Sequence, residues 1–303
     1  MPVAEGAPGP GPGPGPGPGP GPGPVPAPGG PLTAEQERDF FELGYLVLRG
    51  LLAAEEVAEV AAAFDRLKAR AAALELTGTD LTPAGDEKVM CEGSQFVLHA
   101  AGRPGGAPAI RRVVWAGACE PVLSKWGEDR RLLAMARQVL KCGDKAEHLI
   151  CQAHYKEPGD GTWFPAHQDS THRGHGDAAA WEDVNGLGSF VQVLLAVDAA
   201  TDANGPLIVL PRSCEQGHLG LDYSELTQTV DARLEPYLGD QVPLLMEPGD
   251  VALLSPYIVH SSEPNRGGGP RRVFDNGYAA PGANRKLYPG HEAGAGRRVA
   301  LPP

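Results

Sequence analysis

Two potential metal ligands stand two residues apart in the segment Pro165-Ala166-His167-Gln168-Asp169-Ser170. In an extended chain, side chains at positions i and i+2 project from the same face, so the imidazole of His167 and the carboxylate of Asp169 would lie side by side. Alone, such a pair is weak evidence, because a His-x-Asp pair is more often a hydrogen-bonded surface pair than a metal site.

A third potential ligand, His260, follows about ninety residues further along the chain. Two histidines and one carboxylate on one side of an iron ion leave the opposite side open, which is the facial arrangement of non-haem Fe(II) oxygenases. We therefore predict a metal site made by His167, Asp169 and His260. His172 and His175 offer an alternative zinc cluster, but they lie in a polar, Gly-rich segment for which solvent exposure or substrate contact is the simpler interpretation.

Strands that would hold such a site are predicted in the second half of the chain, where short extended runs alternate with Gly, Pro, Asn and Asp. A mainly β jelly roll (double-stranded β-helix, cupin-like), with helices packed on its outside, is the fold that this pattern favours. The expected strands are residues 148–156, 164–169, 189–197, 207–210, 242–246, 251–254 and 272–278.

The first half of the chain predicts helices that cover the barrel. Thr33 and Gln36 have the spacing of a capping box at a helix start. A strand is expected at residues 45–48, and residues 77–120 are Gly- and Pro-rich, so that Arg112–Trp115 fits a strand or a helix. The expected helices are residues 34–43, 57–74 and 130–140.

Alternating Gly and Pro dominate residues 1–32, and such a segment cannot bury enough apolar surface to become ordered. We expect a disordered tail there and a single domain over residues 33–303. Recruitment of a partner protein by the tail is the alternative, although no other docking feature supports it.

The composition narrows the classes of partner. A net charge of -12 without clustered Lys and Arg argues against nucleic-acid binding. No apolar stretch reaches the roughly 18 residues of a membrane span, and no basic flank precedes an apolar run. The five cysteines are widely spaced without a Cys-x-x-Cys pair, which is typical of reduced thiols. We expect a soluble, cytoplasmic protein with no membrane partner.

Several short motifs, taken in order, resemble the phytanoyl-CoA dioxygenase family of Fe(II)/2-oxoglutarate oxygenases, which includes the ectoine hydroxylases. The resemblance covers residues 33–303 and implies Fe(II), 2-oxoglutarate and O2 as reactants, with hydroxylation of a small-molecule substrate and release of succinate and CO2. The motifs are Leu32-Thr33-Ala34-Glu35-Gln36, Gly44-Tyr45-Leu46-Val47-Leu48, Pro165-Ala166-His167-Gln168-Asp169, Asn204-Gly205-Pro206-Leu207, Pro248-Gly249-Asp250-Val251, and His260-x-Ser262 with Pro270-Arg271.

One motif departs from the family pattern. Where the family usually reads Pro-Gly-Ser-His, this chain has Pro211-Arg212-Ser213-Cys214, which affects a local turn rather than the ligands. Halogenating relatives carry a small residue in place of the metal carboxylate, so the presence of Asp169 favours hydroxylation.

By the same resemblance, Arg271, eleven residues after His260, would bind the far carboxylate of 2-oxoglutarate. A guanidinium suits that role because it offers paired hydrogen bonds. Arg272 is the alternative, since neighbours on a strand face opposite ways. Gln152 and Ser262 are further candidates for contact with the cosubstrate.

The substrate-side candidates are His154, Gln192 and Trp181. Trp181 is the single aromatic residue of the segment 173–188, which we expect to be a lid, with Asp183 as a second candidate near the substrate. For the polar candidates, the alternative is a side chain whose hydrogen bonds are satisfied inside the barrel. Polar and charged residues around the expected entrance favour a small polar or zwitterionic substrate.

Two other functions fit parts of the sequence. A cupin-like metal-dependent hydrolase or isomerase would use the same ligands without 2-oxoglutarate, and it would not need Arg271. A non-catalytic jelly-roll binding protein could recruit a partner through the Gly/Pro tail, but the intact set of metal ligands argues against it.

Overall fold

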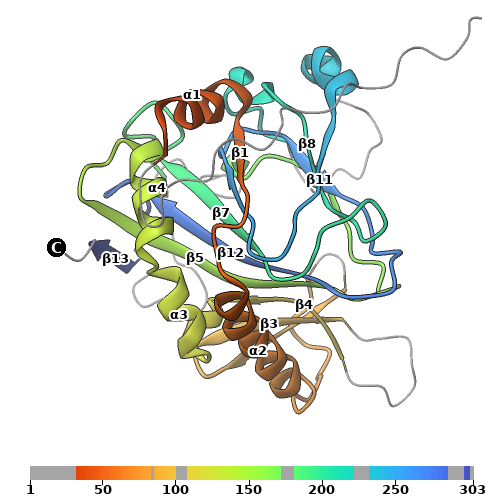
Figure 1. Ribbon diagram of the computed structural model, residues 1–303. Helices are drawn as coiled ribbons and strands as arrows, with labels where there is room; N and C mark the ends of the chain where they lie inside the picture. The colour runs from red at the N-terminus through yellow and green to blue at the C-terminus, as the bar shows by residue number, and fades with distance from the viewer. Residues whose placement is uncertain are drawn as a thin grey trace, which may run out of the picture.

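Two antiparallel sheets form the core of the protein in the computed structural model (Figure 1). The structure describes residues 32–82, 85–99, 108–171, 181–221 and 232–285, and the backbone of residues 297–300. The larger sheet has the strand order β1-β10-β7-β12-β5-β4-β3-β2, with β13 also paired to β5, and the smaller sheet has the order β6-β11-β8-β9. From β5 to β12 the chain passes back and forth between the sheets, which is the predicted jelly roll.

The helices and strands are as follows: α1 (Ala34–Leu43), β1 (Tyr45–Leu48), α2 (Ala54–Ala71), β2 (Glu87–Cys91), β3 (Ser94–His99), β4 (Ala109–Val114), η1 (Ala116–Ala118), α3 (Pro121–Gly127), α4 (Arg130–Leu140), β5 (Lys145–Lys156), β6 (Phe164–His167), β7 (Phe190–Ala196), β8 (Leu207–Val209), η2 (Ser213–Gln216), η3 (Ala232–Asp240), β9 (Val242–Leu244), β10 (Val251–Leu254), β11 (His260–Ser262), β12 (Arg271–Ala279) and β13 (Arg297–Ala300). None of the described helices is long and apolar enough to cross a membrane. All five cysteines are free thiols.

The sequence predictions agree with most of these elements. The capping box of Thr33 and Gln36 is present at the start of α1, and the segment 112–114 belongs to strand β4. The sequence did not predict strands β2, β3 and β13, the three-residue strand β11 or helix α3. Leu32, which we assigned to the tail, is buried in the core, and residues 1–31 lie outside the described part of the chain.

Alternation along β12 and β5 separates the two faces of the larger sheet. Side chains at every second position of a strand share a face. Phe274 of β12 and Tyr155 of β5 face the helices, where Phe64 of α2 packs with its ring centroid 5.1 Å from Tyr155 and 6.4 Å from Phe274. Helices α2, α3 and α4 therefore cover the outer face of this sheet (Figure 1). Its inner face is directed toward the space between the two sheets.

A buried lysine connects the two sheets at one end. Lys156, the last residue of β5, is only 1% exposed. Its ammonium donates to the hydroxyl of Ser262 in β11 (2.7 Å) and to the carbonyl oxygen of Glu263. Burial, followed by the charge of Arg271, lowers the pKa of Lys156 to about 7. The larger sheet is thus fastened to β11 by a side chain that gives up much of its solvation.

Replacing Phe64 with Ala should remove the central contact between α2 and the sheet. Because Phe64 is fully buried, we expect a loss of about 3–5 kcal/mol in the free energy of unfolding, measured by urea denaturation. Phe64→Leu should cost less than about 1.5 kcal/mol. A loss below about 1 kcal/mol for Phe64→Ala would contradict this packing.

Lys156 should make stability depend on pH. Between pH 7 and 10 the unfolded chain keeps a proton on this lysine, whose ordinary pKa is 10.5, while the folded chain releases it. Stability therefore rises with pH in that range. Relative to Lys156→Met, the wild-type free energy of unfolding should increase by up to about 1.4 kcal/mol per pH unit. Parallel pH profiles of the two proteins would show that the lysine stays charged when buried.

Candidate metal centre

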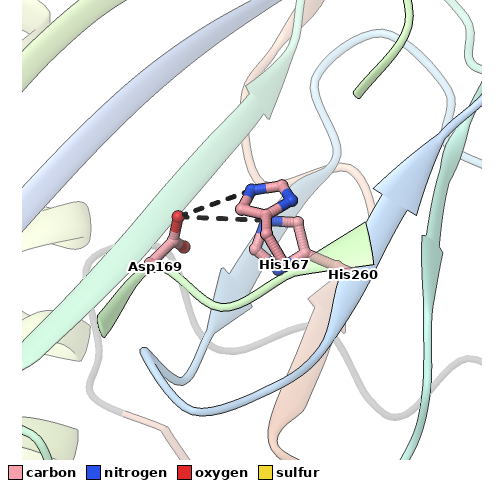
Figure 2. A group of neighbouring side chains, drawn as sticks. All are labelled: His167, Asp169 and His260. Atoms are coloured by element: carbon pink, nitrogen blue, oxygen red, sulfur yellow. Dashed lines mark ion pairs between the residues drawn. The ribbon is translucent and has the colours of Figure 1, made fainter. Parts of the chain in front are cut away.

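The three predicted ligands come together where β6 meets β11. His167 is the last residue of β6 and His260 is the first of β11, and the two are Cα partners in this antiparallel pair. Figure 2 shows both imidazoles beside the carboxylate of Asp169, whose Oδ1 is 3.9 Å from the Nε2 of each histidine. The imidazole ring centroids are 4.1 Å apart. All three side chains are buried.

Hydrogen bonds to the backbone fix which imidazole nitrogens face the site. The Nδ1 of His167 lies 2.7 Å from the carbonyl oxygen of Pro165, and the Nδ1 of His260 lies 3.2 Å from that of Ile258. A carbonyl can only accept, so each Nδ1 carries the proton and each Nε2 keeps its lone pair. Orienting bonds of this kind are typical of histidines that bind metals.

Gln168 holds the turn between the first two ligands. Its side chain is fully buried and points into the protein, where Nε2 donates to the carbonyl oxygens of Gly217 (2.8 Å) and Tyr257 (2.6 Å). Its Oε1 accepts from the backbone N–H of Leu219 (2.7 Å). These three bonds fix the segment, so that His167 and Asp169 face the opposite direction.

The donor set fits a single divalent ion. One atom from each of the three residues lies within 4.8 Å of the other two. In a facial arrangement the ligands lie about 90° apart, so that bonds of about 2.0–2.2 Å put neighbouring donor atoms about 3 Å from one another. The 3.9 Å separations would therefore close by about 1 Å when an ion binds. Two imidazoles and one carboxylate with an open side are the ligands of a facial non-haem iron site.

A cavity of about 380 Å³ adjoins these residues between the sheets. Apart from Gln192, its walls are apolar toward β7, β8, β9 and β10, and they carry most of their polar side chains toward β3, β4, β5 and β12. The polar and charged residues of the lining are Gln95, Arg112, Gln152, His154, His167, Asp169, Gln192, His260, Ser262, Arg271 and Asp275.

Arg271 and its neighbour have opposite surroundings. Arg271 lines the cavity and is 7% exposed, and burial lowers the pKa of its guanidinium to about 10. Within the described residues, no carboxylate forms an ion pair with it. Arg272 lies on the other face, where Asp198 and Asp65 bind it at 2.8 Å. Of these two neighbouring arginines, Arg271 is therefore the one whose guanidinium is available to an anion in the cavity.

The other predicted site residues are placed unequally. Gln152, His154, Gln192 and Ser262 all line the cavity. Trp181 is not part of the described lining, because its ring packs edge-on against Phe190, with centroids 6.2 Å apart.

The proposed lid lies partly outside the described residues, as do His172 and His175. In its described part, Asp183 accepts hydrogen bonds from Ser189 Oγ (2.8 Å), the Gly188 N–H (2.9 Å) and the Tyr257 hydroxyl (3.1 Å). Asp183 therefore anchors this segment to the start of β7 rather than facing the cavity.

Sequence reasoning missed four polar residues in or beside the cavity. Gln95 and Arg112 belong to β3 and β4, in the region where no strands were assigned. Lys156 was seen only as the end of a strand. Asp275 stands four residues after Arg271 in the same strand, so the alternation used for Arg271 would also have identified it.

The departure from the family motif is a local substitution. Arg212 adopts a φ of +68°, a conformation that favours glycine, the residue usual at this place in the family. Ser213 keeps a structural contact, because its hydroxyl donates to the Leu210 carbonyl oxygen (2.7 Å) and accepts from the Val259 N–H (2.9 Å). The turn therefore still supports the residue that precedes His260.

Part of this chain is similar in sequence to a curated protein. A methylphosphonate hydroxylase from Gimesia maris is 36% identical over 121 residues, which are 40% of this chain and 40% of that protein. The chain thus matches about two fifths of the length of this curated relative.

Solved structures share the fold. Iron-bound EctD from S. alaskensis has 25% identity and a TM-score of 0.59, covering 86% of this chain and 80% of EctD. The same protein with 2-oxoglutarate and 5-hydroxyectoine has 24% identity and a TM-score of 0.62, covering 89% and 86%. AviO1 from Streptomyces viridochromogenes has 20% identity and a TM-score of 0.57, covering 82% and 96%.

The family comparison covers most strands of both sheets and all three candidate ligands. Residues 40–273 match the family described as Phytanoyl-CoA dioxygenase (PhyH), which agrees with the resemblance of the sequence motifs. With well over half of its length matched, the chain belongs to the phytanoyl-CoA dioxygenase family.

Proposed function

We propose that this protein is a non-haem Fe(II)/2-oxoglutarate-dependent dioxygenase that hydroxylates a small polar molecule. The observation that carries the proposal is Arg271, a buried guanidinium without a carboxylate partner in the described residues, in the same cavity as His167, Asp169 and His260. Burying such a charge is costly unless an anion binds it. An anionic cosubstrate would supply that partner.

His167, Asp169 and His260 would hold Fe(II) through two Nε2 atoms and one carboxylate oxygen. When bound, iron with 2-oxoglutarate and O2 supplies the oxidation of a substrate C–H bond, with succinate and CO2 as the other products. The remaining tasks of the protein are to bind the two organic molecules, to orient them and to keep water out.

Arg271 and Ser262 would bind the far carboxylate of 2-oxoglutarate. The guanidinium can donate two parallel hydrogen bonds to it. The hydroxyl oxygen of Ser262 accepts from the ammonium of Lys156, so its own proton is available for donation into the cavity. Gln152, which lines the same cavity, is a further donor to the cosubstrate.

The size of the cavity favours a small substrate. About 380 Å³ must hold both 2-oxoglutarate and the substrate, and this volume is near the lower end of ordinary ligand sites. A long acyl chain would not fit. The relatives support the same class, since one is named a methylphosphonate hydroxylase and another was crystallised with 2-oxoglutarate and 5-hydroxyectoine.

A metal-dependent hydrolase or isomerase is the second candidate, because it would use the same three ligands. It gives no role to Arg271, whose burial costs stability. The requirement for 2-oxoglutarate therefore separates the two functions.

Arg271→Gln should weaken the binding of 2-oxoglutarate by about 100-fold or more, because a buried carboxylate loses its charged partner. Arg271→Lys should restore part of the affinity. Calorimetric titration of the Fe(II)-loaded protein with 2-oxoglutarate under anaerobic conditions measures both changes.

Arg272→Gln is the matched control, since it makes the same change on the neighbouring residue of the opposite face. It removes the pairs with Asp198 and Asp65 and should lower stability while leaving the affinity for 2-oxoglutarate nearly unchanged. If Arg272→Gln weakened the binding of 2-oxoglutarate as much as Arg271→Gln does, the assignment of Arg271 would be wrong.

Asp169→Ala should lower the affinity for Fe(II) by at least about 100-fold, because it removes the anionic one of the three proposed ligands. Loss of a residue that only hydrogen-bonds to a metal ligand typically lowers metal affinity by about 10–100-fold, and loss of a ligand should cost more. Metal content after equilibrium dialysis measures this change. Asp80→Asn, at a largely exposed carboxylate, is the control and should bind Fe(II) like the wild type. An Fe(II) affinity equal to that of the wild type in Asp169→Ala would show that this carboxylate is not a ligand.

A further inference from the structure

Asp275 is a buried carboxylate in the cavity wall to which the proposed chemistry gives no role. It is 4% exposed and belongs to the lining. Its Oδ1 has no hydrogen-bond partner in the described part of the chain, and its Oδ2 lies 3.5 Å from the Nε2 of His154. A carboxylate is acceptor-only when ionised, and an acceptor buried without a donor is costly.

The register of the sheet places Asp275 away from the cosubstrate end. Arg271 and Asp275 share the inner face of β12 four residues apart, a separation of about 13 Å along a strand. The Cα partners of Asp275 are Gln152 and Leu194, which also line the cavity. The two charged groups thus lie at different positions along β12, on the same wall of the cavity.

The positions of the metal ligands indicate which end of β12 faces the cosubstrate and which faces the substrate. At the Arg271 level, its Cα partner Lys156 binds Ser262, two residues beyond His260 in β11. At the other end, the backbone N–H of Ser170, next to Asp169, donates to the Pro256 carbonyl oxygen (2.9 Å), close to the end of β10. With 2-oxoglutarate at Arg271, the space beside Asp275 is left for the substrate.

We infer that Asp275, together with His154, binds a hydrogen-bond donor of the substrate, either an ammonium or a hydroxyl group. This inference rests on the proposed function, because that function assigns Arg271 to 2-oxoglutarate. An ionised carboxylate that receives a donor in a confined, partly apolar cavity makes a strong, directional bond. Such a bond would orient the substrate relative to the metal and would set the substrate class.

Arg112 supplies the competing charge on the same wall. It is the Cα partner of His154 and also lines the cavity. If Arg112 determined the substrate class, an anionic group would bind best at this end. If Asp275 determines it, a donor group binds best, and comparing donor-bearing with anionic probes decides between the two residues.

Pentylamine, pentan-1-ol and pentanoate are suitable probes because they share one alkyl chain and differ in a single end group. Their dissociation constants can be measured by ligand-observed NMR on protein loaded with 2-oxoglutarate and with Zn(II) in place of Fe(II). We expect the amine or the alcohol to bind about tenfold more tightly than pentanoate in the wild type.

Substitution of Asp275 distinguishes the two donors. A preference for the amine should disappear in Asp275→Asn, which removes the charge. A preference for the alcohol should persist in Asp275→Asn, which keeps an acceptor, and disappear in Asp275→Leu. Asp80→Asn, on the exposed surface, should keep the wild-type preference.

The affinity for 2-oxoglutarate shows whether a negative result counts against the role of Asp275 or against the proposed function. Variants that bind 2-oxoglutarate like the wild type are folded at the Arg271 end, so their probe affinities report on Asp275. The inference fails if pentanoate binds as tightly as both donors, or if a donor preference survives in Asp275→Leu. If the wild type itself does not bind 2-oxoglutarate, it is the proposed function that fails.

Discussion

The antiparallel pairing of β6 with β11 is the interaction on which the site depends. It sets His167 opposite His260, and the chain then needs only one more turn to bring in Asp169. Both strands are short, with four and three residues, so they depend on their surroundings. Gln168 fixes the turn after β6, Ser213 supports the residue before β11, and Lys156 ties β11 to the larger sheet.

The cavity reflects a balance between stability and function. Arg271 and Asp275 are buried in its wall and Lys156 is buried beside it. Each of these charged groups loses its hydration, a cost that apolar side chains in the same places would not carry. The opposite face of the same strands is conventional, since Phe274 and Tyr155 pack against α2 and Arg272 is paired with acidic groups. Strand alternation keeps these two environments apart.

Local rules predicted those parts of the fold whose causes are local. The capping box predicted the start of α1 and the apolar stripe predicted α2. The i, i+2 spacing predicted His167 beside Asp169, although β6 ends at His167 and a turn, not an extended strand, brings in Asp169. Strand β11 was missed because three residues are too few for a recognisable pattern, although His260 itself was identified. The polar residues of β3 and β4 were missed because their strands exist only through pairing beside β5. Trp181 illustrates the limit for loops, since only tertiary packing turned its ring toward Phe190.

The pairing of β6 with β11 serves a dioxygenase only if the iron that it would hold also binds 2-oxoglutarate. The most direct measurement is an anaerobic titration of the metal-free protein, first with Fe(II) and then with 2-oxoglutarate, followed by visible absorption. Chelation of iron by the cosubstrate should produce a weak charge-transfer band that saturates at one equivalent of each. If Fe(II) binds but 2-oxoglutarate produces no band, the dioxygenase assignment is contradicted, and a metal-dependent hydrolase or isomerase becomes the better description.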